Sequence, residues 1–538
     1  MTDLAESLKE ATRVYGLSPS DGVAVGVVKD GEPIARYCGG LANRVLERPF
    51  APTSGFRICS ITKHFVCLVL LMAENEGLLT LGQSPSGFFE GQIDFDAKLT
   101  LHDLCTNRSG LLDYWCAAML FGAGAESTFT RENADAILPL CADGGAPSQE
   151  FSYCNTNFMV LGRIIEKVYG SPLSDILTEK IFDPAGMRST YLGANTAHPL
   201  PGWTIGYETD GNDRKITAET NIIWEGDAGI VSNLEDMLAW EKQFHDEGAP
   251  LFPLTNKLTA GDPETGYKLG MRVAKRSGRT EHLHTGGLRG WRSARLFLAD
   301  ERLSVVVLMN HMREPASLAR LVADNMLNEN SVPNKTKTGH LSSTNAKPET
   351  KKYISRTAGI VASIQWSDDE VIIQTGGRSF RAFKSANDHY ERVDDNGDRT
   401  TIFRTTIKST EKTLDSWRLE LPDEGGVYVF EAIDDDHNRL SAHQFEGAYH
   451  HPSGLGVATI KVNAGGLMIE FDGFLGRSRA IPLYLTANDV ATFTCSRALD
   501  HPAPGEFTCT LKEDQGRKSL TVSCWHARGV RFESQSPR

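Results

Sequence analysis

The chain lacks the features that mark a nucleic-acid-binding or membrane protein. It has no block of basic residues, since 56 Lys and Arg stand against 69 Asp and Glu and leave a formal net charge of −13. Nucleic acid and anionic membranes need a basic surface, so neither is expected as a partner, and a small polar or cationic substrate fits this charge better. No apolar run is long enough to cross a bilayer.

Two further absences bear on the cell compartment. Residues 1–16, MTDLAESLKEATRVYG, have neither the apolar core nor the small-residue cleavage site of a secretory signal. The ten cysteines are scattered, without a CxxC pair or the spacing of zinc ligands. We interpret them as buried thiols in a reducing cytoplasm, and Cys59 and Cys154 as small core side chains. No metal or other cofactor is expected.

At 538 residues the chain is too long for one compact core. Residues 1–330 mix helical and strand patterns, whereas the C-terminal part alternates apolar and polar residues with turn signals. Residues 331–352 are rich in Ser, Thr, Asn, Lys and Pro and predict an exposed linker. We therefore predict an α+β domain, an antiparallel sheet flanked by helices, followed by two antiparallel β-barrel domains over residues 353–437 and 438–538.

Three local patterns within residues 1–330 predict particular elements. The dipeptide Asp30-Gly31 indicates a hairpin turn between two strands. The run NTNFMVLGRIIEKVYG has helical spacing and ends at Gly170, a residue typical of a helix end. The β-branched run from Leu303 to Asn310, LSVVVLMN, predicts a buried strand that a closing helix follows.

The first chemical motif is Ser60-x-x-Lys63, directly before a strongly apolar helical run. Residues three apart on a helix share a face, so the Lys63 amine can reach the Ser60 hydroxyl and accept its proton if burial lowers the lysine pKa. The same spacing recurs at Ser409-x-x-Lys412 in a polar, strand-rich stretch, which we interpret as chance. By itself the motif is equally compatible with an ordinary helix start and a solvated lysine.

Two more motifs follow along the chain. Tyr153-x-Asn155 precedes a helical run, and a tyrosine near a lysine can act as a base toward serine and then as an acid toward a leaving amine, while Asn155 can bind a substrate carbonyl. His284-x-Gly286 lies at a predicted strand edge, where backbone N–H groups, with that of Ser60, could form an oxyanion hole. Taken singly, these residues are also compatible with core, cap and turn positions.

The order Ser-x-x-Lys, Tyr-x-Asn, His-x-Gly resembles the penicillin-recognising serine hydrolases, which include class C β-lactamases, D-Ala-D-Ala carboxypeptidases, esterases and D-amino-acid peptidases. The segments DLCTNRSGLLDYW and IFDPAGM also look like the β-lactamase-like catalytic domain of that family. The resemblance implies that Ser60 is the acylated nucleophile and that Lys63 and Tyr153 carry protons.

The segments GWRSARLFLADERLS, FDGFLGRSRAIPLY and CWHARGV are similar to the bacterial D-aminopeptidases, and the likeness covers nearly the whole chain. It implies two eight-stranded barrels and a loop of the last barrel that brings an aspartate, here Asp500, to the substrate amine. Without the resemblance, Asp500 is a solvated turn residue before Pro502. His284 occupies the position where carboxypeptidase and β-lactamase relatives carry a lysine that binds a substrate carboxylate.

We therefore predict a cytoplasmic serine aminopeptidase that releases N-terminal D-amino acids such as D-alanine from small peptides, amides and esters through an acyl-enzyme. The preference for the D configuration comes from the resemblance alone, which also leaves a homodimer open. An esterase, β-lactamase or D-Ala-D-Ala carboxypeptidase of the same fold is the second hypothesis. A non-catalytic binding protein with a vestigial site is the third.

Overall fold

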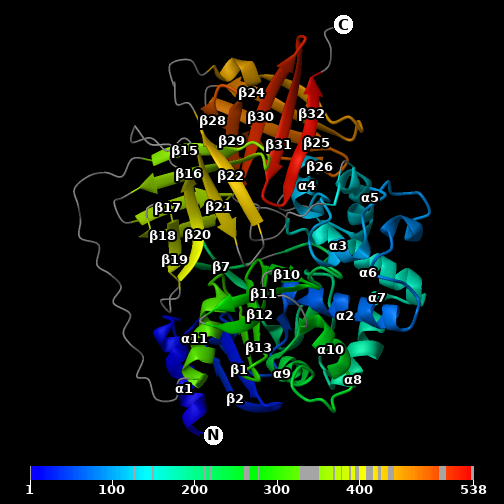
Figure 1. The fold of residues 1–538 in the computed structure, drawn as a ribbon, viewed down its shortest axis with the longest axis vertical. Coiled ribbons are helices and arrows are strands. Elements are labelled where there is room, and N and C mark those ends of the chain that lie inside the picture. Colours follow the sequence, from blue (N-terminus) through cyan, green and yellow to red (C-terminus); the bar gives the residue numbers. More distant parts are fainter. Residues whose placement is uncertain are drawn as a thin grey trace. The chain divides into compact units, whose positions relative to one another are not determined.

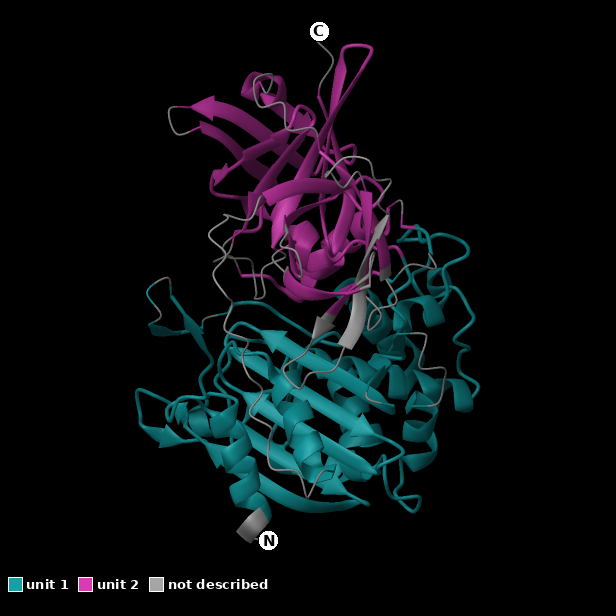
Figure 2. Cartoon of the chain, turned by 60° about the vertical axis from the view of Figure 1, so that its left-hand side comes forward, with its two compact units in different colours: residues 1–109, 146–151, 155–335 teal, residues 110–145, 152–154, 336–538 magenta. Residues whose placement is uncertain are grey.

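The chain folds into two compact units, which Figure 2 colours separately. The first unit holds residues 1–109, 146–151 and 155–335, and the second holds residues 110–145, 152–154 and 336–538. Two short segments from the first third of the chain are therefore grouped with its C-terminal part. The computed structural model describes residues 2–534 except 125–127, 144, 148–150, 211, 213, 219, 260–265, 277, 328–349, 367–369, 377, 387–388, 394–398, 407–415, 422–425, 434–440, 464–465 and 496–504.

The first unit is built on a seven-stranded antiparallel sheet (Figure 1), with the strand order β10-β11-β12-β13-β14-β1-β2. The predicted turn at Asp30 and Gly31 joins β1 to β2, and both residues have positive φ angles, 52° and 87°. The predicted buried strand is β14, which pairs with β1. The strands are β1 (Val23–Lys29), β2 (Glu32–Gly39), β10 (Gly266–Lys268), β11 (Met271–Arg276), β12 (Arg279–Leu288), β13 (Trp291–Leu298) and β14 (Leu303–Met309).

Helices cover both faces of this sheet. On one face α1 (Thr2–Val14) and α11 (Pro315–Leu327) contribute Leu8 and Leu318 to an apolar core shared with Val25 of β1. On the other face a Cβ at Gly26 of β1 would lie 2.8 Å from a methyl carbon of Leu238 in α9 (Leu234–Lys242). Strand β1 is buried on both faces, which explains its unbroken run of apolar and small residues.

A group of helices beside the sheet carries the sequence motifs. Helix α2 (Thr62–Asn75) is buried without interruption from Thr62 to Ala73 and contacts α6 (Asn155–Tyr169) and α10 (Phe252–Thr259). Helix α6 ends at Gly170, which has a φ of 66°, as predicted. Shorter helices are α3 (Leu101–Cys105), α7 (Leu173–Leu177) and α8 (Asp183–Ala185). Among the described residues, no helix is both long and apolar enough to cross a membrane.

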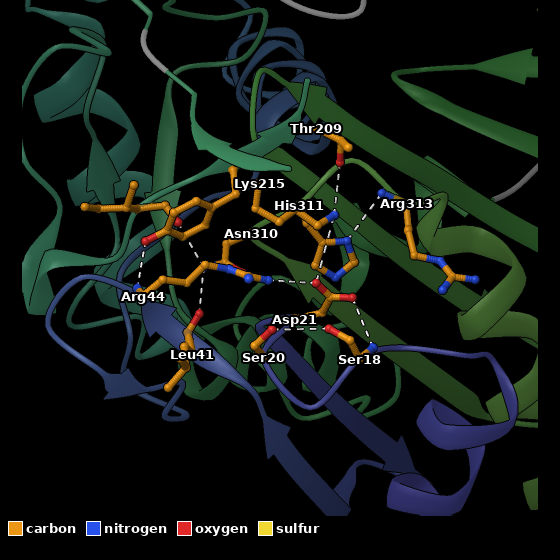
Figure 3. A network of polar contacts seen from close by, with 12 residues as sticks. Ser18, Ser20, Asp21, Leu41, Arg44, Thr209, Lys215, Asn310, His311 and Arg313 are labelled. Atoms are coloured by element: carbon orange, nitrogen blue, oxygen red, sulfur yellow. Dashed lines mark hydrogen bonds and ion pairs between the residues drawn. The ribbon is translucent and has the colours of Figure 1, made fainter. Parts of the chain in front are cut away.

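A buried carboxylate joins loops at one edge of the first unit (Figure 3). Asp21 accepts a hydrogen bond from the Ser18 N–H (3.1 Å) and pairs with Arg44 (2.9 Å) and Lys215 (4.0 Å). Burial acts to raise the pKa of Asp21, but the Ser18 N–H and the charges of His311 and Lys215 outweigh it, so the pKa is lowered. Burial lowers the pKa of His311 to about 4. At neutral pH the network therefore holds an ionised Asp21 beside a neutral His311.

Among its described residues, the second unit contains two antiparallel β structures, the α-helices α4 and α5, and the short 3₁₀ helix η7 (Ala442–Phe445). Strands β15 to β22 form a closed barrel, and strands β23 to β32 form a ten-stranded sheet with the order β26-β25-β24-β23-β32-β31-β30-β29-β28, in which β27 pairs with β25. Phe121, directly after α4, packs against Phe532 of β32 and against Phe474 in the turn between β25 and β26. The predicted architecture, an α+β domain followed by an antiparallel β region, is confirmed, and the described pairings close the first of the two predicted barrels.

The elements of the second unit are α4 (Tyr114–Leu120), α5 (Arg131–Ala142), β15 (Thr350–Ser355), β16 (Ile360–Trp366), β17 (Glu370–Thr375), β18 (Arg378–Ala386), β19 (His389–Val393), β20 (Arg399–Thr406), β21 (Ser416–Leu421), β22 (Gly426–Ala432), β23 (Gly447–His450), β24 (Gly456–Asn463), β25 (Gly466–Gly473), β26 (Gly476–Arg477), β27 (Ile481–Pro482), β28 (Tyr484–Ala487), β29 (Val490–Thr494), β30 (Glu506–Asp514), β31 (Arg517–Cys524) and β32 (Ala527–Ser534).

The ten cysteines all lie among the described residues, and no disulfide joins any of them. All except the half-buried Cys38 are buried. Burial raises the pKa of Cys38 and of Cys495 to about 12, so these thiols stay protonated and poorly nucleophilic at neutral pH. The prediction of buried thiols is confirmed.

Candidate active site

Ser60 lies in a strained turn that opens the buried helix α2. Strand β5 (Phe56–Arg57) leads to Cys59, which has a φ of 55° although it carries a side chain, and residues 59–61 form the short helix η1 (Cys59–Ile61). Left-handed backbone at such a residue persists only where the surrounding packing enforces it. The turn leaves Ser60 partly exposed, whereas Lys63 is fully buried. The hydroxyl is therefore the end of this motif that a substrate can reach.

The Lys63 amine has an acceptor for each of the three protons of an ammonium group. Its Nζ lies 3.1 Å from Ser60 Oγ, 2.8 Å from Asn155 Oδ1 and 2.8 Å from the carbonyl oxygen of Asp227. It also lies 5.3 Å from the centre of the Phe158 ring, on the second turn of α6. The structure thus brings Ser60, Lys63 and Asn155 together, with the two helix starts of α2 and α6 facing each other.

Asn155 differs from its predicted role in one respect. The sequence predicts that its amide binds a substrate carbonyl, whereas in the structure its Oδ1 accepts a hydrogen bond from Lys63. Its side chain is half-buried at the first residue of α6. Binding of a substrate carbonyl by Asn155 stays a prediction.

Tyr153 belongs to the second unit. Its carbonyl oxygen lies 3.1 Å from His526 Nδ1, and the two rings meet edge to face at 5.9 Å. Its side chain is half-buried, while Cys154 beside it is buried. The placement of the Tyr153 phenol relative to Ser60 and Lys63 stays a prediction.

His284 is buried on β12 with both ring nitrogens engaged. Nδ1 lies 2.7 Å from the carbonyl oxygen of Thr285, which can only accept, so Nδ1 carries the hydrogen. Nε2 lies 3.0 Å from the Tyr267 hydroxyl, which must then donate to it. Burial and, after it, the charge of Lys63 hold the pKa of His284 well below its usual value. The third motif therefore supplies a neutral ring and no fixed cation.

Gly286 lets β12 pass directly against the Ser60 turn. A Cβ at this position would lie 2.3 Å from the carbonyl oxygen of Ile58 and 2.2 Å from Ser293 Oγ. Ser293 is the register partner of Gly286 on β13, and its hydroxyl donates to that same Ile58 carbonyl (2.8 Å). The glycine of the motif is thus required by backbone approach, and this part of β12, an interior strand of the sheet, lies beside the Ser60 turn.

A buried polar layer lies behind the site. The indole N–H of Trp240 donates to His64 Nε2 (2.8 Å), and burial, followed by the charge of Arg295, lowers the pKa of His64 well below its usual value. Arg295, opposite His284 in register, binds Glu241 through two hydrogen bonds of 2.7 and 2.6 Å. Both members of this ion pair are fully buried, so its geometry joins β13 firmly to α9.

The sequence pointed to neither Asp227 nor Tyr267 as a site residue. Asp227 contributes a backbone carbonyl, which no side-chain motif reveals. Tyr267 reaches His284 across the intervening strand β11, so only the sheet order brings them together. Ser293 was also missed, although a hairpin turn at Gly290 would have predicted that it lies opposite Gly286 on the next strand. Asp500, predicted at the substrate amine, lies outside the described residues.

Comparison with known proteins agrees with this geometry. Residues 19–325 match the β-lactamase family, and residues 370–533 match domain B of D-aminopeptidase. A D-aminopeptidase of Gluconobacter oxydans is 33% identical over 538 residues, and one of Brucella anthropi is 32% identical over 537, each alignment covering 96% of both chains. The chain belongs to the D-aminopeptidase family. Membership confirms both the β-lactamase-like fold of its first part and the predicted class, a serine hydrolase.

Solved structures agree on the fold. The octameric penicillin-binding protein homologue of Pyrococcus abyssi matches with a TM-score of 0.55 at 20% identity, over 80% of this chain and 99% of that one. D-amino acid amidase of Ochrobactrum anthropi SV3 matches with a TM-score of 0.50 at 20% identity, over 61% and 99% of the two chains. Both likenesses concern the fold alone, which this member of the D-aminopeptidase family shares with them.

Proposed function

We propose that this chain is a serine aminopeptidase that releases N-terminal D-amino acids, D-alanine among them, from small peptides, amides and esters. The observation that carries the proposal is the Lys63 amine, buried and 3.1 Å from the half-exposed Ser60 hydroxyl. Family membership supports the substrate class, since the relatives that align over the whole chain are named D-aminopeptidases. A cytoplasmic location and a homodimer stay predictions from the sequence.

In the proposed reaction Ser60 Oγ attacks the carbonyl carbon of the substrate. The hydroxyl proton passes to the pair of Lys63 and Tyr153, and the same pair returns a proton to the leaving amine as the C–N bond breaks. Water then attacks the Ser60 ester, loses a proton to that pair and releases the D-amino acid as the serine regains its hydrogen. Backbone N–H groups of Ser60 and of β12 near Gly286 would stabilise the oxyanion.

The charges around the site favour a substrate with a free amine. His284 is neutral, so the position that binds a carboxylate through lysine in carboxypeptidase and β-lactamase relatives has no cation here. Asp500 would pair with the substrate α-ammonium, an attraction that strengthens when water is excluded. The neutral His284 and the negative charge of Asp500 together predict that the enzyme prefers substrates with a free amine over substrates that are recognised through a carboxylate.

Hydrolysis of D- and L-alanine p-nitroanilides by wild type, Ser60→Ala and Ser409→Ala tests the proposal. Ser409 belongs to the second Ser-x-x-Lys spacing and serves as the matched control. We expect D-selective turnover, its loss in Ser60→Ala by about 10³-fold or more, and no change in Ser409→Ala. A fluorophosphonate should add to Ser60 in the wild type, as seen by mass spectrometry of the peptides.

Three results would contradict the proposal. Equal or L-biased rates would remove the stereospecific assignment. Faster turnover of penicillin, or of a peptide with a blocked N-terminus, than of the free-amine substrate would favour the esterase, β-lactamase or carboxypeptidase hypothesis. Absence of any adduct on Ser60 would favour a binding protein.

A further inference from the structure

The turn between β31 and β32 contacts three other segments of the second unit. It consists of Trp525 and His526, and Cys524 pairs with Ala527 at its base. The Gly529 N–H donates to Ser523 Oγ (2.9 Å), which joins the ends of the two strands. The two side chains of the turn contact different neighbours: Trp525 contacts the first barrel, and His526 contacts Tyr153.

Trp525 packs into the core of the first barrel. Its indole meets the Tyr428 ring edge to face at 4.7 Å and belongs to the same buried apolar cluster. Gly376 has a φ of 53°, and a Cβ there would lie 1.8 Å from Cδ1 of the indole, so a side chain is excluded at the point of contact. Arg528 Nη2 donates to the Tyr428 hydroxyl (3.2 Å). The barrel therefore determines where the turn lies.

His526 contacts two segments of the second unit, one at Asp113 and one at Tyr153. Its own carbonyl accepts a hydrogen bond from the Asp113 N–H (3.0 Å), at the residue that caps α4. Its Nδ1 lies 3.1 Å from the Tyr153 carbonyl oxygen, and because that oxygen can only accept, Nδ1 must carry the hydrogen. The imidazole also meets the phenol ring at 5.9 Å and 70°. One side chain thus contacts both the main chain and the ring of Tyr153.

Buried thiols pack the same segments together. Burial raises the pKa of Cys116 in α4 well above its usual value, and the hydrogen bond with Cys524 and the proximity of Cys154 act in the same direction. Cys116 belongs to α4, Cys524 lies at the base of the turn, and Cys154 directly follows Tyr153. The main chain of residues 152–154 therefore lies near α4 and the base of the hairpin, while the Tyr153 ring itself contacts the imidazole of His526.

We propose that His526 is a positioning residue for Tyr153, through which the C-terminal sheet holds the phenol in place for proton transfer. The inference rests on the proposed function, in which Tyr153 is a proton carrier. It assigns the β structures a part in the reaction that is independent of the Asp500 loop. A displacement of about 1 Å in a catalytic group can lower a rate by about 100-fold, so loss of the imidazole contact should affect the chemical step.

Kinetics of His526→Ala, His526→Asn and Arg531→Ala with D-alanine p-nitroanilide test this role. The amide nitrogen of Asn can occupy the place of Nδ1, and Arg531 is an exposed residue of the same hairpin whose side chain is 60% exposed. We expect kcat to fall by about 10- to 100-fold in His526→Ala with KM changed less than about twofold. His526→Asn should recover most of the loss, and Arg531→Ala should equal the wild type.

The pH profile separates positioning from a structural effect. A displaced phenol should shift a limb of the kcat profile in His526→Ala and not in His526→Asn, whereas partial unfolding lowers the amplitude at every pH. If His526→Ala does not fold, His526→Leu, which keeps the volume and removes the donor, replaces it. A wild-type kcat in His526→Ala or His526→Leu, or an equal loss of kcat in His526→Asn and His526→Ala, would overturn the positioning role. In either case an inactive Ser60→Ala would still uphold the proposed function. An active Ser60→Ala would overturn the proposed function itself.

Discussion

His284 shows what burial does to a single residue. Its Nδ1 donates to a backbone carbonyl and its Nε2 accepts from Tyr267, and burial and the Lys63 charge lower its pKa. A free histidine gains a proton as the pH falls through about 6.5. A lowered pKa moves that event to more acidic pH, so His284 should stay neutral where an exposed histidine is already charged.

Long-range ¹H–¹⁵N NMR of the imidazole checks this. We expect one protonated and one unprotonated ring nitrogen at a pH where an exposed histidine is already charged, with Nδ1 as the protonated atom and the signal identified by its absence in His284→Asn. An imidazolium pattern near neutral pH would contradict the assignment. A charged His284 would also place a cation at the position where carboxypeptidase and β-lactamase relatives carry a lysine, and would remove the reason to expect a preference for free-amine substrates.

At the scale of the element, the approach of β12 to the Ser60 turn depends on one glycine. Gly286→Ala would place a methyl group 2.3 Å from the Ile58 carbonyl and 2.2 Å from Ser293 Oγ, both held by their mutual hydrogen bond. The strand or the turn must shift, which we expect to destabilise the protein by about 1–3 kcal/mol and to lower kcat/KM by about tenfold or more.

Gly287→Ala, one residue along the same strand, is the matched control. Its Cβ would approach the guanidinium of Arg292 at 2.5 Å, which is the far end of a flexible side chain and can move aside. Melting temperature and kcat/KM should therefore change little in this variant. Similar losses in both variants would show that β12 is sensitive to any side chain and that the contact with the turn is not the cause.

At the scale of the whole molecule, the neutrality of buried histidines ties the stability of the first unit to pH, and His64, His245, His282, His284 and His311 are all buried there. Burial lowers the pKa of His245, His282 and His311 to about 4 each. The unfolded chain takes up their protons near pH 6.5, so between about pH 6.5 and 4 it binds more protons than the folded state, and stability falls as the pH falls. Each histidine contributes a slope of up to about 1.4 kcal/mol per pH unit.

Hydrogen exchange followed by mass spectrometry measures this loss in the peptides of the first unit. We expect their protection to decrease from about pH 6.5 downward. His245→Gln removes one titrating group while its amide can still meet Ser304, now 2.9 Å from Nε2, and should make the pH dependence shallower. An unchanged slope in this variant would exclude His245 as a contributor.

Short-range patterns were enough to predict the architecture and part of the site. The hairpin at Asp30-Gly31, the end of α6 at Gly170 and strand β14 depend on local backbone preference and burial. The contact of Lys63 with Ser60 follows from helical spacing alone, because neighbours three residues apart meet on one face. These features involve few residues, so their patterns are visible in the linear chain.

The distant groups that complete the site come together only in the folded chain. The carbonyl of Asp227 reaches Lys63 from 164 residues away, Tyr267 binds His284 across a strand, and residues 110–145 join the C-terminal unit. Such contacts depend on sheet order and on packing among segments that the chain brings together only after folding, and no local pattern encodes them. The nucleophile motif, its helix and the family follow from the order of residues along the chain, whereas the charge, tautomer and position of the site groups depend on long-range packing.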